Sequence, residues 1–233
     1  MPSPTDSSPS PDAPAAARQP SSQKFSSQHT LTTEGGELVY TAVAEWQILR
    51  DRDKPVAELF HVAYLADGEA ANQRPLTFVF NGGPGAASAY LHMGALGPKR
   101  VYFNPDGSLP QPPVQVVDNA ETWLAFTDLV FIDPVGTGFS RSLEEDEKPN
   151  DKPVSTPDED KPKETKFWSV DRDLKALGEF IQGFLSRQQR WLSPIFIAGE
   201  SYGGFRVARL VKHLQQDYGV GLSGAILISP AME

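Results

Sequence analysis

The chain has 233 residues, a formal net charge of −9 and a pI near 5.0. This acidic balance argues against nucleic acid as a partner, because phosphate-binding surfaces need an excess of Lys and Arg. Cysteine is absent, which excludes disulfides, thiol catalysis and thiolate metal sites, and no run of 18 apolar residues predicts a membrane span.

The N-terminal part predicts a polar tail followed by a hairpin. Residues 1–30 are rich in Pro, Ser, Ala and Gln, and they cannot bury enough apolar surface to offset the entropy of ordering. We therefore expect a disordered tail over 1–30 and a folded domain over 31–233. Two strands, at 38–49 and 57–65, flank a charged turn, which predicts an antiparallel hairpin.

Downstream, strands alternate with helices. Short apolar runs predict buried strands, and apolar residues at helical spacing predict helices. The expected elements are strands at 76–80, 129–132, 195–198 and 225–228, and helices at 167–191 and 203–218. This alternation predicts an open α/β fold with a mostly parallel sheet and right-handed crossovers.

An acidic stretch interrupts this pattern at about 143–166. It holds nine acidic residues, five basic residues and four prolines, with scarcely any side chain that could join a core. Such a composition predicts an exposed insertion in the domain.

The pentapeptide Gly-Glu-Ser-Tyr-Gly at 199–203 is the clearest chemical motif. It directly follows the apolar run at 195–198 and precedes the predicted helix at 203–218. This arrangement predicts a nucleophile elbow, a sharp strand-to-helix turn that exposes a serine hydroxyl above a sheet. Because the strained turn leaves no room for a β-carbon at its flanks, the glycines support this interpretation. Ser201 is therefore the candidate nucleophile.

A second motif, Asn-Gly-Gly-Pro-Gly at 81–85, follows the predicted strand at 76–80. It fits neither glycine-rich phosphate-binding pattern, since it lacks Gly-Lys-Ser/Thr and the Gly-x-Gly-x-x-Gly spacing. An oxyanion hole fits better, because hydrolases with an elbow take one N–H from the residue after the serine and one from an earlier loop. Those amides would be Tyr202 and either Gly83 or Gly82.

A third turn, Asp133 to Ser140, follows the predicted strand at 129–132 and reads Asp-Pro-Val-Gly-Thr-Gly-Phe-Ser. The residues alone favour a structural role for Asp133 at the end of its strand over a catalytic one.

The three motifs, in this order and spacing, resemble the serine carboxypeptidases, a cathepsin A-like family of the α/β-hydrolase fold. The resemblance runs from about Glu37 to the C-terminus and omits the acidic insertion. It implies that Ser201 is acylated, and that Asn81 and Glu200 bind the C-terminal carboxylate of the substrate. A glutamate can bind a carboxylate only if one of the two carries a proton.

The chain also departs from the family pattern. Ala95 stands where the family usually has a second glutamate, and Ala86 stands in place of a usual cysteine. Many members are secreted and disulfide-bonded, and no signal-peptide pattern is visible here. We therefore expect a cytoplasmic protein, with secretion as the alternative.

The rest of a catalytic triad is not evident. In this fold the order is Ser, then Asp or Glu, then His. After Ser201 only His213 and then Asp217 follow, in the reverse order, and His213 would lie about 18 Å along the helix. Proton abstraction needs contact near 3 Å, so we expect ordinary helix-surface residues. The other histidines precede the serine: His29, His61 and His92. We expect the triad Asp and His to lie outside this chain.

The resemblance implies a missing C-terminal half, with the sheet truncated after the strand that follows the nucleophile helix. The function it implies is release of C-terminal residues from peptides through an acyl-enzyme on Ser201. An esterase or acyltransferase of the same fold, a non-catalytic binding half-fold and a decayed-gene product remain as alternatives. We expect a peptide substrate, the missing half as a further partner, and no metal, organic cofactor, nucleic acid or membrane.

Overall fold

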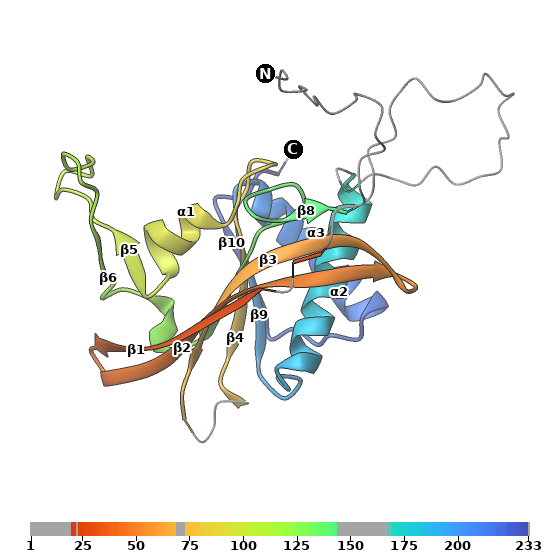
Figure 1. The fold of residues 1–233 in the computed structure, drawn as a ribbon, viewed down its shortest axis with the longest axis horizontal. Coiled ribbons are helices and arrows are strands. Elements are labelled where there is room, and N and C mark those ends of the chain that lie inside the picture. Colours follow the sequence, from red (N-terminus) through yellow and green to blue (C-terminus); the bar gives the residue numbers. More distant parts are fainter. Residues whose placement is uncertain (1–19, 22, 69–72, 144–166, 168, 233) are drawn as a thin grey trace, which may run out of the picture.

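The computed structural model describes residues 20–21, 23–68, 73–143, 167 and 169–232. Most of its described strands build one large sheet, whose strand order is β1-β2-β3-β7-β4-β9-β10, with the short β8 beside β3 (Figure 1). Strands β5 and β6 form a separate two-stranded antiparallel sheet. The strands are β1 (Lys24–Thr33), β2 (Gly36–Asp51), β3 (Lys54–Ala66), β4 (Leu76–Phe80), β5 (Lys99–Val101), β6 (Val116–Asp118), β7 (Asp128–Ile132), β8 (Arg141–Ser142), β9 (Ile195–Glu200) and β10 (Gly224–Ile228). The helices are α1 (Ala89–Leu91), η2 (His92–Leu96), η3 (Trp123–Ala125), α2 (Val170–Arg187) and α3 (Tyr202–Asp217).

The antiparallel half of the sheet contains the predicted hairpin. Strands β2 and β3 pair from Tyr40↔Ala66 to Asp51↔Lys54, with a register shift at Leu49/Arg50. This confirms the hairpin expected over 38–49 and 57–65, although both strands extend further at each end. Strand β3 then pairs antiparallel with β7 and joins the hairpin to the parallel strands.

The N-terminal tail needs a correction. Residues 24–30 were expected within the disordered tail at 1–30, but they belong to strand β1, which pairs with β2 from Lys24↔Glu45 to Thr33↔Gly36. Leu31 is its one buried side chain, so the strand depends on its backbone ladder and shows no apolar pattern. Residues 1–19 of the tail and 144–166 of the predicted insertion lie outside the described residues.

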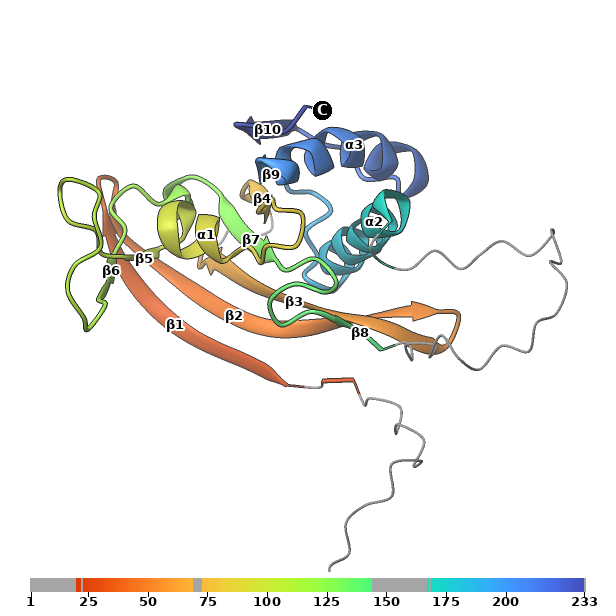
Figure 2. The same cartoon turned by 90° about the horizontal axis from the view of Figure 1, so that it is seen from above.

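The parallel half confirms the expected α/β architecture. Strand β4 pairs parallel with β7 and β9, and β9 pairs parallel with β10. Helices α2 and α3 cover one face, while α1, β5 and β6 lie on the other (Figure 2). Along β4, Phe78 and Phe80 join the core beneath α2 and α3, whereas Val79 joins the core of the opposite face. Because both faces are covered, every residue of β4 is buried.

Both long helices lie where the apolar periodicity predicts them. Ser169 caps α2, since its hydroxyl accepts a hydrogen bond from the Arg172 amide at 3.3 Å. The apolar stripe of α2, which includes Phe180 and Phe184, packs on the sheet as expected. Strands β5, β6 and β8 and the short helix η3 had no counterpart in the sequence-based expectations, because segments of two or three residues show no periodicity.

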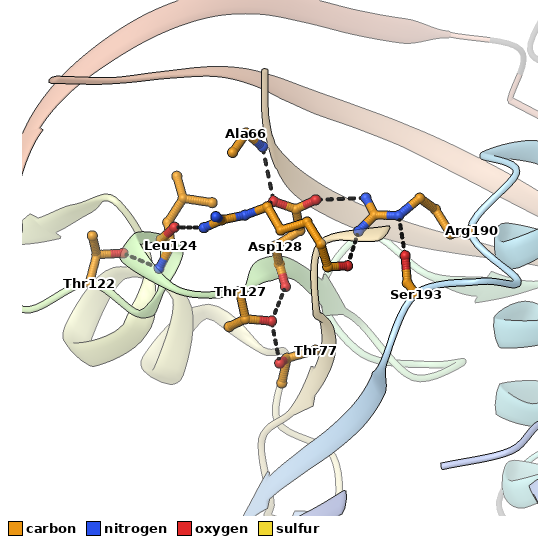
Figure 3. A network of polar contacts seen from close by, with 9 residues as sticks. Ala66, Thr77, Thr122, Leu124, Thr127, Asp128, Arg190 and Ser193 are labelled. Carbon is orange, nitrogen blue, oxygen red and sulfur yellow. Dashed lines mark hydrogen bonds and ion pairs between the residues drawn. The ribbon is translucent and has the colours of Figure 1, made fainter. Parts of the chain in front are cut away.

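A buried charged network joins the amino ends of the parallel strands (Figure 3). Asp128, which is fully buried, opens β7 and accepts hydrogen bonds from Arg190 at 2.6 Å and from Arg74 at 2.9 Å. Arg190 precedes β9 and also donates to the Arg74 carbonyl at 2.7 Å and to Ser193 at 2.7 Å. The Ala66 amide, at the end of β3, donates to Asp128 as well. One carboxylate therefore ties together the ends of four neighbouring strands.

We expect Asp128→Asn to lower the free energy of unfolding by about 3–5 kcal/mol, because the two guanidinium groups keep their charge and lose its compensation. Urea unfolding measures this loss. The control is Asp118→Asn, which breaks the exposed pair between Asp118 and Lys99 and should cost less than about 1 kcal/mol. Equal losses in the two variants would show that the network does not hold the strand ends.

Candidate active site

Ser201 occupies a strained turn between β9 and α3. Its backbone has φ 56° and ψ −121°, a conformation that residues with a β-carbon rarely adopt. Backbone hydrogen bonds to both its amide and its carbonyl hold it there. The Ser201 amide donates to the Ile228 carbonyl at 3.0 Å, and the Ser201 carbonyl accepts from the amides of Gly204 at 2.9 Å and Ala231 at 3.0 Å. The end of β10 thus braces the turn, which has the geometry expected of a nucleophile elbow.

The glycines of the pentapeptide are required by close backbone contacts. A β-carbon on Gly203 would lie 2.6 Å from the Phe80 carbonyl oxygen and 2.8 Å from that of Asn81. A β-carbon on Gly199 would overlap the carbonyl of Gly203. The start of α3 can therefore press against the end of β4 because Gly203 lacks a side chain, and against the end of β9 because Gly199 lacks one.

The glycine-rich loop packs directly on the elbow. A β-carbon on Gly82 would lie 2.8 Å from both the Ser201 β-carbon and the Tyr202 amide nitrogen. Tyr202 is the first residue of α3, so its amide has no acceptor within the helix. Gly83 follows in the exposed part of the loop with φ 115°. The segments that carry the expected oxyanion donors Gly82, Gly83 and Tyr202 are thus in contact beside Ser201.

Asn81 and Glu200, expected to bind a substrate carboxylate, are also brought together. The Asn81 side-chain amide donates to Glu200 Oε2 at 3.4 Å. The Asn81 side-chain oxygen accepts from the Leu91 amide at 2.9 Å, which fixes the orientation of the amide group. Asn81 is buried and Glu200 is half-buried, so the glutamate presents the more accessible polar group.

Asp133 has the structural role that its sequence context favours. Its carboxylate accepts hydrogen bonds from the Ser88 amide at 2.9 Å and the Phe139 amide at 3.2 Å. Burial raises the pKa of this carboxyl, and the two amides oppose that shift. Asp133 therefore joins the loop after β7 to the segment that follows the glycine-rich loop.

The histidines are engaged elsewhere. His29 Nε2 lies 2.7 Å from the Ser27 hydroxyl, and His92 Nε2 lies 2.6 Å from the Tyr64 hydroxyl. The His61 ring packs against Phe180 and Phe184, and its Nε2 lies 3.5 Å from a carboxylate oxygen of Glu45. His213 Nδ1 lies 2.8 Å from a carboxylate oxygen of Asp217. Among the described residues, none of these rings hydrogen-bonds Ser201. His213 and Asp217 form an (i, i+4) pair on α3, in agreement with the expectation of a helix-surface pair.

Arg206 is a neighbour of the site that sequence reasoning missed. Its side chain is buried and contacts Asn81, Tyr202 and Asp173. An arginine inside an amphipathic pattern normally indicates the solvent face of a helix, so nothing in the local sequence predicts its burial. Within the described ranges, no cluster of three His, Asp or Glu side chains offers a metal site.

Comparison with known proteins gives one family. A family model described as serine carboxypeptidase matches residues 47–232. Serine carboxypeptidase-like 13 of Arabidopsis thaliana is 30% identical over 177 residues, which cover 74% of this chain and 36% of that protein. Pheromone-processing carboxypeptidase kex1 of Schizosaccharomyces japonicus is 28% identical over 208 residues, covering 88% of this chain and 34% of that protein. The chain spans about a third of the length of these curated relatives.

Solved structures resemble the chain in fold alone. A bacterial heroin esterase matches with 15% identity and a TM-score of 0.42, over 81% of this chain and 44% of the esterase. The peroxisomal alpha-beta-hydrolase Lpx1 of Saccharomyces cerevisiae matches with 12% identity and a TM-score of 0.41, over 89% and 44%. In the part of the chain that the structure describes, no helix is long and apolar enough to cross a membrane. The cytoplasmic location stays a prediction.

We expect Gly82→Ala to lower the free energy of unfolding by about 1–3 kcal/mol, because its β-carbon would press on Ser201 and Tyr202. Urea unfolding of the variant measures the loss. Gly94→Ala is the matched control, since a β-carbon there meets nothing within 4 Å. If the two variants lose equal stability, the loop does not pack on the elbow as described.

We also expect stability to fall as the pH is lowered from about 6.5 toward 4. Burial lowers the pKa of His92 from 6.5 to about 4, so the unfolded chain binds a proton that the folded chain does not. Across that pH range, this one ring lowers the free energy of unfolding by up to about 3 kcal/mol. His61, whose pKa is also lowered by burial, adds to the slope with the same sign.

Urea unfolding at several pH values tests this account in His92→Gln, where the slope should be shallower. Met93→Leu, at the next position of η2, is the control and should keep the original slope, because it removes no titratable group. An unchanged slope in His92→Gln would contradict the assignment of His92 as a buried neutral ring.

Proposed function

Because the chain belongs to the serine carboxypeptidase family of α/β hydrolases, we propose that it carries the nucleophile of a serine-type carboxypeptidase. The enzyme releases C-terminal residues from peptides through an acyl-enzyme on Ser201. The single observation that supports this most is the packing of the glycine-rich loop on the elbow, where a β-carbon on Gly82 would lie 2.8 Å from Tyr202 N and from Ser201. This contact supports the proposal, because the two expected oxyanion donors belong to these adjoining segments.

In the proposed reaction, Ser201 Oγ attacks the carbonyl carbon of the last peptide bond and gives its proton to a base. The amides of Tyr202 and Gly83 stabilise the oxyanion, and each such donor is typically worth about 3–4 kcal/mol. The C–N bond then breaks, and the leaving amine takes the proton. Water hydrolyses the acyl-enzyme by the same route in reverse order and regenerates Ser201.

The base of this reaction lies outside the 233 residues in our proposal. The four histidines of the chain contact other partners, and the relatives are about three times longer than the matched part. A serine without a base is a weak nucleophile, so the 233-residue chain alone should be nearly inactive.

Substrate selection in this proposal uses the Asn81–Glu200 pair. The Asn81 amide donates to Glu200, and Glu200 shares a proton with the C-terminal carboxylate of the peptide.

The test uses the intact protein that contains this chain and measures release of C-terminal residues from blocked dipeptides. We expect Ser201→Ala to lower kcat/KM by at least about 10⁴-fold, because the nucleophile is removed. Ser223→Ala is the control. This exposed serine precedes β10 and lies at the amino ends of the parallel strands, whereas Ser201 lies at their carboxyl ends, so its loss should change little.

Two other outcomes would replace the proposal. Hydrolysis or transfer of simple esters without release from peptides would indicate an esterase or acyltransferase of the same fold. No turnover of either substrate class by the intact protein, with Ser201→Ala leaving its biological activity unchanged, would favour a non-catalytic binding protein.

A further inference from the structure

Arg206 lies beneath the candidate site with only 4% of its surface exposed. It is on α3, one helical turn after Tyr202, and faces inward between α2 and the end of β4. A buried guanidinium needs partners for its charge and its N–H groups. The partners of Arg206 lie at the end of β4, at the start of α3 and on α2.

The first partner fixes the glycine-rich loop. Arg206 Nη1 donates a hydrogen bond to the Asn81 carbonyl oxygen at 3.1 Å. That carbonyl belongs to the peptide group that joins Asn81 to Gly82, so the bond sets the orientation of this peptide plane. The next peptide group carries the Gly83 amide, the expected oxyanion donor. Because the donor is charged, the bond is stronger than one between neutral groups.

The second partner is the ring of Tyr202. The Arg206 guanidinium carbon lies over this ring, 5.2 Å from its centroid. Tyr202 carries the other expected oxyanion donor on its backbone. The same guanidinium therefore contacts both segments whose amides would form the hole.

The third partner anchors the guanidinium. Arg206 Nε donates to Asp173 Oδ2 at 2.7 Å, and Asp173 lies in the first turn of α2. This carboxylate compensates the buried charge and is itself favoured by the helix N-terminus. Arg206 thus spans from a fixed anchor on α2 to the loop and the elbow.

We propose that Arg206 is a positioning residue that sets the relative placement of the two oxyanion donors, an inference that rests on the proposed function. The planar fork of arginine binds two acceptors in different directions at once. Lysine has a single point charge on a flexible stem, so it cannot keep Asp173 and the Asn81 carbonyl in the same arrangement.

Steady-state kinetics of the intact protein on blocked dipeptides give the first test. We expect Arg206→Lys to lower kcat about 10- to 100-fold, because small misplacements of catalytic donors have effects of this size. KM should change less than about threefold, since the carboxylate-binding side chains remain in place. The control is Arg209→Lys, an exposed arginine on the same helix that also lies over an aromatic ring, Phe205, and it should leave both constants unchanged.

A second variant separates positioning from simple bracing of the helices. Asp173→Asn removes the ion pair between α2 and α3 and leaves the contact of Arg206 with Asn81. We expect a smaller loss of kcat than in Arg206→Lys. A loss in Asp173→Asn that equals or exceeds that in Arg206→Lys would overturn the proposal, because Arg206 would then act only through the ion pair.

Amide hydrogen exchange of residues 81–91 tests the inference without relying on turnover. We expect this segment to exchange about tenfold faster in Arg206→Lys, the change that corresponds to losing one charge-assisted hydrogen bond. Arg209→Lys should match the unsubstituted protein. Unchanged exchange in Arg206→Lys would overturn the inference even in an active carboxypeptidase. Faster exchange in a protein without peptidase activity would support the contact and contradict the proposed function instead.

Discussion

The close backbone contact between the end of β4 and the start of α3 is the constraint on which the candidate site depends. Because β4 and β9 are parallel neighbours, the loops after them emerge at the same edge of the sheet. They can touch only where side chains are missing, and β-carbons on Gly82 or Gly203 would lie 2.6–2.8 Å from backbone atoms of the other segment. The glycines of the two motifs are thus two sides of one contact.

The strained backbone of Ser201 is held in place by structure outside the turn as well as by the turn itself. The amide and carbonyl of Ser201 are hydrogen-bonded to Ile228 and Ala231, which lie at and beyond the end of β10. The Asp128 network fixes the opposite ends of β3, β7, β4 and β9. Buried charge thereby ties the amino ends of the parallel strands, and the candidate site lies at their carboxyl ends, where open α/β sheets bind their ligands.

The parallel strands, the hairpin and both long helices could be predicted from sequence, because their buried positions carry apolar residues at the spacing of a strand or a helix. Strand β1 could not, since a polar edge strand is held by backbone hydrogen bonds and leaves Leu31 as its one buried side chain. The contact between Asn81 and Glu200 joins residues 119 positions apart, so local patterns do not predict it and only the family resemblance grouped the two residues. Arg206 was missed for a related reason: its burial follows from partners on β4 and α2 that local spacing does not reveal.

We propose above all that Ser201 and the amides of Tyr202 and Gly83 form a single acyl-transfer site. A crystal structure of the intact protein treated with a peptidyl phosphonate would test it most directly, because the phosphonyl oxygen imitates the oxyanion. We predict a covalent bond to Ser201 Oγ, with the phosphonyl oxygen about 2.7–3.1 Å from both amide nitrogens. An adduct on another residue, or one on Ser201 whose oxygen points away from both amides, would contradict the claim.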